Sequence, residues 1–218
     1  DEMTLNEKWS LNGGVNADVF HISGKTFATL SPRLSMKFQP TERLSLKASY
    51  TLMSQFVHKI ANSYLDLPTD YWVPTTARLH PMRSWQVAAG AYMKPNKHWL
   101  LSLEAYYKRS SHILQYSSWA GLEPPAANWD YVVMAGDGRS YGVELDADYY
   151  VSDLTLPAPY TLSWTEKQLD HIYDGWYYDK FDNRHKLTLT GRWNITKKIA
   201  AFAAWTFRTS NRMTIPTP

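Results

Sequence analysis

The chain contains no cysteine among its 218 residues, which excludes a disulfide framework and a cysteine-based zinc site. It also lacks any run of about 18 consecutive apolar residues, so it has no transmembrane helix. Neither sign of charge dominates, because 23 lysines and arginines are set against 20 aspartates and glutamates. The basic residues are spread over the chain and not clustered, so the composition gives no support to nucleic-acid binding.

Recognisable catalytic patterns are missing as well. The seven histidines include no pair separated by about three to five residues, the spacing of many zinc sites. The segment from Gly136 to Arg139 is typical of a turn before a strand and not of a nucleotide-binding loop. Serine, histidine and aspartate residues show no organised spacing that suits a nucleophile and its base. We therefore predict no catalytic residues, no metal site and no cofactor, and we expect that the chain is not an enzyme.

What the sequence has instead is strict alternation of apolar and polar residues over nine stretches. In the fifth stretch, for example, one set of alternate positions is Trp99, Leu101, Leu103, Ala105 and Tyr107. Successive side chains of a strand point to opposite faces, so a period of two indicates a β-strand. The nine stretches cover residues 9–19, 34–38, 44–52, 85–93, 99–107, 141–151, 160–164, 187–195 and 199–207. The apolar positions of all nine carry no charge, and we predict that they share one face of an all-β structure.

The lengths of strands and connections distinguish a transmembrane barrel from a soluble β-sandwich. The alternation over residues 140–151 is too long for a soluble strand of about 5–6 residues, and it suits the about 9–11 residues that cross a bilayer. Four connections are short, at residues 39–43, 94–98, 152–159 and 196–198, three are long, at residues 53–84, 110–139 and 166–184, and that at residues 21–32 is intermediate. Outer-membrane barrels have tight periplasmic turns and large extracellular loops. We therefore predict the long links at one end of the sheet and the short turns at the other.

Aromatic residues on the apolar positions gather near the strand ends. Those near short turns are Phe38, Trp99, Tyr149, Tyr160 and Trp193, and those toward long loops are Trp85, Tyr107 and Trp164. Amphipathic rings are favoured at membrane interfaces, so this distribution indicates two aromatic belts. The predicted fold class is all-β, an antiparallel transmembrane β-barrel segment of about nine strands. Bacterial barrels have an even number of strands, so we expect residues 1–218 to be part of one β-barrel domain whose remaining strands lie outside this chain.

Three segments resemble the barrel region of TonB-dependent outer-membrane receptors. They are residues 31–50, residues 139–145 (RSYGVEL) and residues 178–187, which end in a strand preceded by Asp182, Arg184 and His185. The resemblance covers roughly residues 28–215. It implies a barrel of the 22-stranded, plugged kind in the cell outer membrane. The plug that contacts the TonB system precedes the barrel in this family, and nothing in this chain matches it.

The resemblance also implies active uptake of a scarce ligand, which is a ferric siderophore, a corrinoid or an oligosaccharide. The expected partners are outer-membrane lipid, this small-molecule or oligosaccharide ligand, and the TonB system through the absent plug. One alternative is an adhesive or structural barrel that transports nothing. A barrel enzyme, such as a lipase or protease, is less favoured because no nucleophile and base are organised in the sequence. A plug domain of about a hundred residues before Asp1 would support transport.

The long loops carry six aromatic residues that we predict to contact the ligand: Trp119, Trp129, Tyr131, Trp176, Tyr177 and Tyr178. Aromatic rings bury a large area at little cost in side-chain entropy, and they stack on sugars and planar ligands. The alternative is that these rings pack the loops against one another over the barrel mouth. Asp179, Asp182 and Arg184 are predicted to form ion pairs at the lumenal rim.

Overall fold

Nine long antiparallel strands follow the nine alternating stretches of the sequence. The structure is a computed structural model that describes residues 2–60, 71–116, 129–170 and 173–212. The long strands are β2 (Trp9–Ile22), β3 (Lys25–Thr41), β4 (Leu44–Gln55), β7 (Met82–Asn96), β8 (Trp99–Tyr116), β9 (Val133–Val151), β11 (Tyr160–Gln168), β13 (His185–Thr196) and β14 (Ile199–Arg208). The predicted all-β antiparallel class is confirmed.

Short strands and one turn of 3-10 helix complete the described elements. The short strands are β1 (Glu2–Thr4), β5 (Val57–Ile60), β6 (Tyr71–Pro74), β10 (Leu154–Pro157) and β12 (Tyr177–Tyr178), and the helical turn covers Trp129–Tyr131. In the described residues, twelve strands form one sheet and β5 and β6 form a second. None of the described helical segments is long and apolar enough to cross a membrane.

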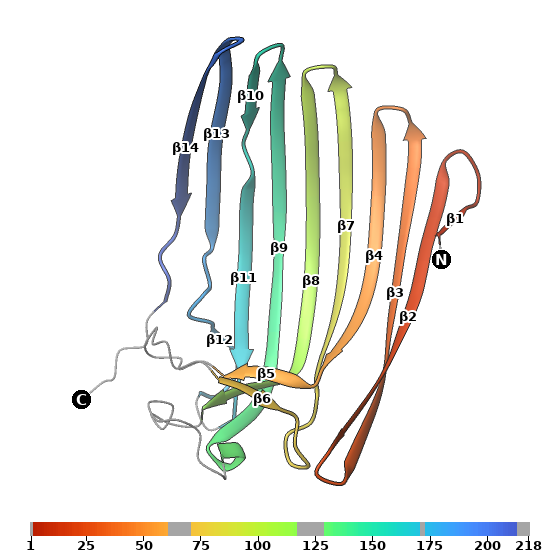
Figure 1. Cartoon of the computed structure of the whole chain (residues 1–218), viewed down its shortest axis with the longest axis vertical. Coiled ribbons are helices and arrows are strands. Elements are labelled where there is room, and N and C mark those ends of the chain that lie inside the picture. Colours follow the sequence, from red (N-terminus) through yellow and green to blue (C-terminus); the bar gives the residue numbers. More distant parts are fainter. Residues whose placement is uncertain (1, 61–70, 117–128, 171–172, 213–218) are drawn as a thin grey trace.

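The sheet is a meander in which neighbours in sequence are neighbours in space. Its order runs β1, β2, β3, β4, β7, β8 and β9, and then β10 and β11 together occupy the position between β9 and β13, with β14 beyond β13. Figure 1 shows the four predicted short turns at one end and β5, β6 and β12, which belong to the long connections, at the other, where the turn between β2 and β3 also lies. The four short turns and the three long connections are therefore separated as predicted, but the link at residues 21–32, predicted to be intermediate in length, is a tight turn at the long-loop end.

The strand register places the predicted apolar positions on one face of the sheet. Leu103 on β8 lies directly opposite Ala91 on β7 and Leu145 on β9. Directly opposed residues of antiparallel strands share a face. The same match continues from Leu46, opposite Ala91, to Leu187, opposite Phe207. Many of these apolar side chains are exposed, which a soluble protein rarely tolerates over so large an area.

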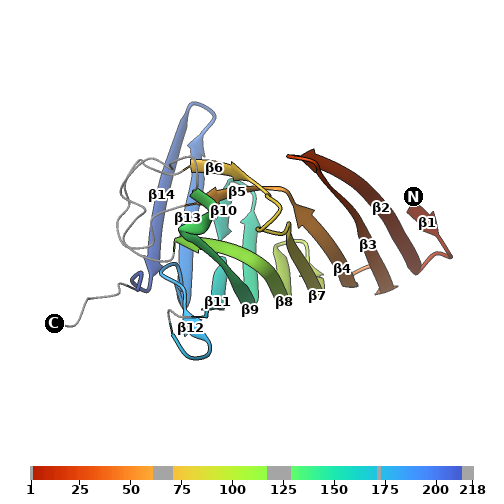
Figure 2. The same cartoon turned by 90° about the horizontal axis from the view of Figure 1, so that it is seen from below.

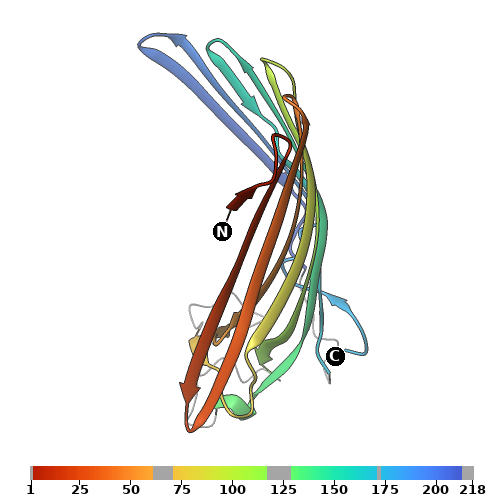
Figure 3. The ribbon, with the colours of Figure 1, turned by 90° about the vertical axis from the view of Figure 1, so that its right-hand side faces the viewer.

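The apolar face is the convex side of a curved sheet. Figure 2 shows the strands as an arc, with β5 and β6 on its inner side and β12 on its outer side, and Figure 3 shows the same curvature from the edge. Two phenylalanines on polar-face positions contact the inner loop, where Phe20 stacks on Phe56 and Phe27 meets His80 edge-on. The polar positions therefore line the concave side, and the apolar positions lie on the outside.

Two predicted connections differ from the structure. The link predicted at residues 21–32 is only a two-residue turn, Ser23 and Gly24, with φ angles of 48° and 77°. Positive φ at both central residues belongs to a hairpin turn that matches strand twist, so β2 and β3 continue to the turn itself. The link predicted at residues 152–159 contains strand β10, which is separated from β11 only near Pro157 and Pro159, because proline cannot donate to the ladder.

A close contact between β9 and β11 explains the glycine of the segment 139–145. A Cβ atom added at Gly142 would lie 2.6 Å from the carbonyl oxygen of Leu162 and 2.9 Å from Cβ of Ser163. Gly142 and Ser163 are directly opposed in the register. A larger residue at position 142 would therefore push the two strands apart.

Candidate functional site

Residues 56–60 and 71–81, between β4 and β7, fold across the concave side of the sheet at its long-loop end. We call this end of the sheet the mouth. It is attached to the β2–β3 hairpin by three contacts. Phe56 stacks on Phe20 with 5.1 Å between ring centroids, and His80 lies edge-on to Phe27 at 6.1 Å. The ammonium of Lys25 donates a hydrogen bond of 3.0 Å to the carbonyl of Ala77. Hairpin β5–β6 is thus held over the end of the polar wall.

The described loops have a small hydrophobic core of their own beneath this hairpin. Its buried members are Ile60, Val73, Leu79, Tyr116 and Val133. Trp129, one of the predicted ligand-contacting residues, packs against this core together with Leu114. The side chain of Trp129 is therefore used at least partly in loop packing, and the hydroxyl of Thr76 donates to the neighbouring Asp130 carboxylate at 3.4 Å.

Tyr131 differs from Trp129 because it faces solvent at the mouth. It is 69% exposed, and the Arg78 guanidinium lies 4.6 Å from its ring centroid. A cation over an aromatic face is attracted by the ring quadrupole, so the two side chains orient each other. Tyr131 and Arg78 together offer a ring face and charged donors to an approaching ligand.

Three histidines meet at the mouth, although their spacing in the sequence does not predict this contact. The rings of His80 and His112 have centroids 5.6 Å apart, and the Nε2 atom of His58 lies 3.3 Å from the hydroxyl of Thr75. His112 sits at a β-bulge with φ 59°, and bulges redirect side chains. Among the residues that the structure describes, no three His, Cys, Asp or Glu side chains are arranged to hold a metal ion.

Burial and the charge of His112 lower the pKa of His58 below its ordinary value of 6.5. His58 binds a proton less readily while hairpin β5–β6 is packed over the wall than when the hairpin opens and exposes it to water. Opening of the hairpin therefore becomes more favourable as the pH falls below about 6.5. We expect the protection factors of the amides in β5 and β6, which are corrected for the intrinsic effect of pH on exchange, to be lower at pH 5.5 than at pH 7.5. A His58→Gln variant should lose this dependence, and an unchanged dependence would contradict it.

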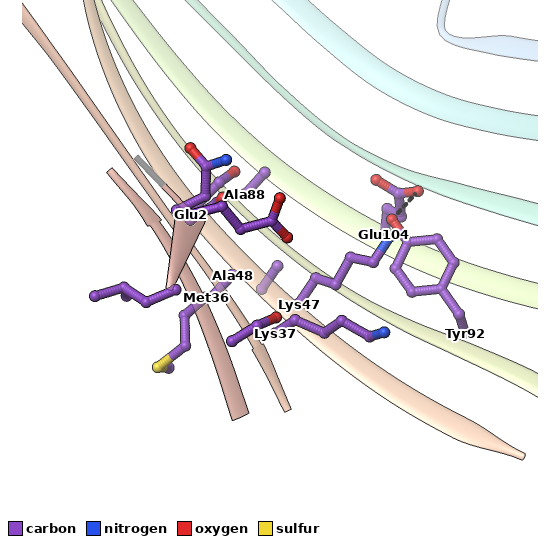
Figure 4. A pocket seen from close by; sticks show the side chains of 14 residues that line it. Glu2, Met36, Lys37, Lys47, Ala48, Ala88, Tyr92 and Glu104 are labelled. Atoms are coloured by element: carbon purple, nitrogen blue, oxygen red, sulfur yellow. Dashed lines mark hydrogen bonds between the residues drawn. The ribbon is translucent and has the colours of Figure 1, made fainter. Parts of the chain in front are cut away.

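The concave wall carries charged and hydroxyl side chains from several strands. This wall contains a cavity of about 310 Å³, lined by residues that include Lys47, Tyr92 and Glu104. Figure 4 shows these three side chains pointing toward one another. The Tyr92 hydroxyl donates a 2.7 Å hydrogen bond to Glu104, and the Lys47 ammonium lies 4.4 Å from the Tyr92 ring centroid. On the next strands, Ser102 donates to Asp146 at 2.9 Å. The wall thus offers both donors and acceptors to polar groups inside the barrel.

The predicted aromatic residues of the last long loop lie on the outer side of the sheet. Trp176 lies beneath the guanidinium groups of Arg139 and Arg109, at 4.3 and 5.8 Å from its ring centroid. Tyr177 contacts Tyr173 edge-on, and Tyr178 on β12 lies opposite Glu166 of β11. Figures 2 and 3 show β12 on the side away from β5 and β6. Trp119 lies outside the described residues, and the other five predicted residues are divided between the mouth and the outer side of the sheet.

The predicted polar cluster forms, with more members than the sequence indicated. Asp182 accepts from Arg184 and from Arg212, each at 3.0 Å, and from the backbone amide of Thr165, also at 3.0 Å. Asp179 pairs with Lys167. The prediction of ion pairing is confirmed, but the Arg184 guanidinium lies over Trp164 of the apolar face and not in the lumen.

The sequence matches a model of the β-barrel of TonB-dependent receptor-like proteins over residues 1–215. Among curated proteins none matches. Solved structures with the same fold include the FrpB iron transporter of Neisseria meningitidis (19% identity, TM-score 0.59), the alcaligin outer-membrane receptor FauA of Bordetella pertussis (13%, 0.60) and Pseudomonas aeruginosa FpvA bound to ferric pyoverdine (11%, 0.63). The alignments cover 87%, 96% and 97% of this chain but only 28%, 36% and 30% of those chains, so it spans about a third of their length.

Proposed function

The chain belongs to the TonB-dependent receptor β-barrel family, and from this premise we propose that it forms part of the wall and outer loops of a receptor for active uptake of a scarce ligand. The observation that carries the proposal is the sheet itself, with an apolar convex face and a polar concave face. A membrane barrel requires an apolar outside, and a passage for a polar ligand requires a polar inside. The family is one of receptors and not of enzymes.

The rest of the barrel and the plug belong to the same proposal. Strand β14 pairs only with β13 in the described residues, so its outer edge carries unpaired backbone groups. Each unpaired group costs several kcal/mol in a bilayer, which favours closure by further strands of a larger, 22-stranded barrel. The polar wall would then enclose a plug that passes energy from the TonB system to the bound ligand.

Among the three ligand classes, we favour a ferric siderophore. Around hairpin β5–β6 the described charged side chains are Lys25, Lys59 and Arg78, set against Asp130, and the histidines lie beside them. Asp137 and Asp170 lie farther along the mouth, in a hollow with His112. A positive mouth raises the local concentration of an anionic ferric chelate. The iron transporter, the alcaligin receptor and the pyoverdine complex named above share this fold and agree with the choice. A neutral oligosaccharide would gain nothing from the charge.

The direct test is binding to the purified full-length receptor, followed by tryptophan fluorescence. The probes are a ferric catecholate, a ferric hydroxamate, cyanocobalamin and a malto-oligosaccharide. We expect one ferric chelate to bind, and we expect Tyr131→Ala with Arg78→Ala to weaken that binding at least tenfold, or about 1.4 kcal/mol. Trp176→Ala, on the outer side of the sheet, should leave the affinity within about twofold.

Three outcomes would overturn parts of this proposal. Binding of cyanocobalamin or the oligosaccharide alone would replace the ferric chelate as ligand. Unchanged affinity in the Tyr131 and Arg78 double variant, with an unchanged amount of folded barrel, would remove these residues from the site. Failure of all four probes to bind, in a receptor that adheres to surfaces, would favour the adhesive barrel.

A further inference from the structure

Four aromatic rings form a continuous row across the convex face near its long-loop end. They are Trp85 on β7, Tyr107 on β8, Tyr141 on β9 and Trp164 on β11. Successive ring centroids lie 5.4, 6.1 and 5.3 Å apart. On a membrane protein, such a row of amphipathic rings lies at the level where the hydrocarbon meets the lipid headgroups. Side chains just beyond the row therefore face the headgroups.

Arginines occupy the positions just beyond this row. Arg109 and Arg139 are directly opposed, two residues along their strands from Tyr107 and Tyr141 and thus on the same face. Arg83 stands two residues before Trp85 on β7, again on the same face. Arg184 covers Trp164, with 4.8 Å from its guanidinium carbon to the ring centroid. Together with Arg212, which shares Asp182, we call these side chains the arginine band.

Two of the three carboxylates that pair with the band lie behind it, and the third, Asp137, is 36% exposed. Glu166, the partner of Arg139, is 10% exposed, and Asp182, the partner of Arg184 and Arg212, is fully buried. The guanidinium side of these pairs is more exposed, at 31% for Arg139, 25% for Arg184 and 49% for Arg212. Arg109 is 47% exposed and pairs with Asp137. A guanidinium has five N–H donors, and these ion pairs use only one or two of them. The band thus presents unused donors outward.

The band also carries more positive than negative charge. Its five arginines meet three carboxylates, those of Asp137, Glu166 and Asp182. Asp182 is shared by two arginines, and Arg83 has no ion-pair partner among the described residues. The Trp176 ring centroid lies 5.8 Å from the Arg109 guanidinium and 4.3 Å from that of Arg139, within the range of cation–π attraction, which holds the two cations together. The arrangement is an ordered, net positive surface at headgroup level.

We propose that the arginine band binds the phosphate groups of a phosphorylated glycolipid in the outer leaflet of the membrane. Arginine binds phosphate through two parallel N–H donors, which gives more geometric selectivity than a lysine ammonium. Directly below the aromatic row, Ala48, Ala89 and Ala105 lie in register and form a hollow of about 660 Å³ on the same face. An acyl chain of the same lipid fills this hollow. The proposal rests on the membrane location proposed above.

The test uses the purified full-length receptor in nanodiscs without uptake ligand. The nanodiscs contain phosphatidylcholine with lipid A that carries two phosphates, with fully dephosphorylated lipid A, or with phosphatidylglycerol. Native mass spectrometry counts the lipids that remain bound. We expect the phosphorylated glycolipid to bind at least tenfold more tightly than its dephosphorylated form, and more tightly than phosphatidylglycerol.

Substitutions locate the site on the convex face. The double variant Arg109→Gln with Arg139→Gln should abolish the preference for phosphate. The single variant Arg83→Gln, which breaks no ion pair among the described residues, should reduce the preference at least threefold and serves if the double variant fails to fold. The matched control is Arg33→Gln with Arg192→Gln, two arginines of the concave face, and it should keep the full preference.

Equal binding of the phosphorylated and dephosphorylated glycolipid would overturn the proposal, and so would a preference that survives loss of the band. Equal binding of phosphatidylglycerol would reduce the band to a general anionic surface and overturn the choice of glycolipid. Because no uptake ligand is present, these results are independent of the test at Tyr131. A receptor can fail to bind ferric chelates and still retain this lipid.

Discussion

Replacing Leu103 with arginine is expected to lower the free energy of unfolding of the receptor by about 2–4 kcal/mol. Leu103 lies on the convex face midway between Trp99 and Tyr107, at the ends of the apolar part of β8, so it is close to the middle of the bilayer. A guanidinium there loses its water and finds no partner in the hydrocarbon. Unfolding of the full-length receptor in phospholipid vesicles by guanidinium chloride, followed by tryptophan fluorescence, measures the change in free energy.

The matched control is Thr188→Arg on β13. Thr188 lies opposite Thr206 on the concave face, where a new guanidinium stays in contact with water. The cost there should be well under about 1 kcal/mol. Similar costs at the two positions would show that both faces have the same surroundings, as in a soluble sandwich, and would contradict the assignment of the convex face to lipid.

Replacing Asp182 with alanine is expected to cost about 3 kcal/mol in the local stability of the β11–β12 region. The substitution removes the partner of Arg184 and Arg212, and it leaves the backbone amide of Thr165 without its acceptor. Hydrogen exchange at the Thr165 amide should accelerate by about a hundredfold. Exchange within β2, on the far side of the sheet, should not change.

The dependence on pH provides a second measure of the same carboxylate. Burial raises the pKa of Asp182, but the Thr165 amide and the two arginines lower it more, so the net shift is below the ordinary value of 3.8. A lowered carboxylate pKa contributes stability that is fully present above about pH 4 and is lost as the pH falls through the lowered pKa. The exchange rates of the wild-type protein and of Asp182→Ala should therefore converge in strong acid. A difference that stays constant down to about pH 2 would contradict the role of the charge.

The strands could be predicted because alternate residues of each strand face lipid and water, and the sequence alternates between apolar and polar residues accordingly. A one-residue slip would place Glu104 or Asp146 in the lipid, so the sequence itself determines the register of β8 and β9. The sequence pattern does not locate the turn at Ser23, because polar and apolar residues continue to alternate on both sides of it. Strands β2 and β3 extend there as a hairpin beyond the membrane. The short strand β10 was missed because Pro157 and Pro159 indicate a turn, although they only interrupt a strand.

The functional surfaces were harder to predict because they depend on how distant loops close. The three histidines of the mouth come together only when the chain before β7 folds over it, and their spacing in the sequence does not predict this contact. They are His58, His80 and His112. The sequence predicts that Trp176 contacts an uptake ligand. Its contacts with Arg109 and Arg139 place it instead on the convex side of the wall. An aromatic residue in a loop sequence indicates a binding surface without indicating what is bound.

The most direct test of the account is the accessibility of single spin labels along β9. These 218 residues contain no cysteine, so once any cysteine elsewhere in the full-length receptor is replaced by serine, one cysteine at a time can be introduced at position 141 and at positions 143–149 of the receptor in bilayers. Position 142 is left as glycine because it has no room for a side chain. We expect labels at Tyr141, Val143, Leu145, Ala147 and Tyr149 to collide with lipid-dissolved oxygen, and labels at Glu144, Asp146 and Asp148 to collide less with it. A period of two that places the odd positions in lipid would support the barrel wall. Equal accessibility of odd and even positions, or access of a water-soluble nickel reagent to Leu145, would contradict it.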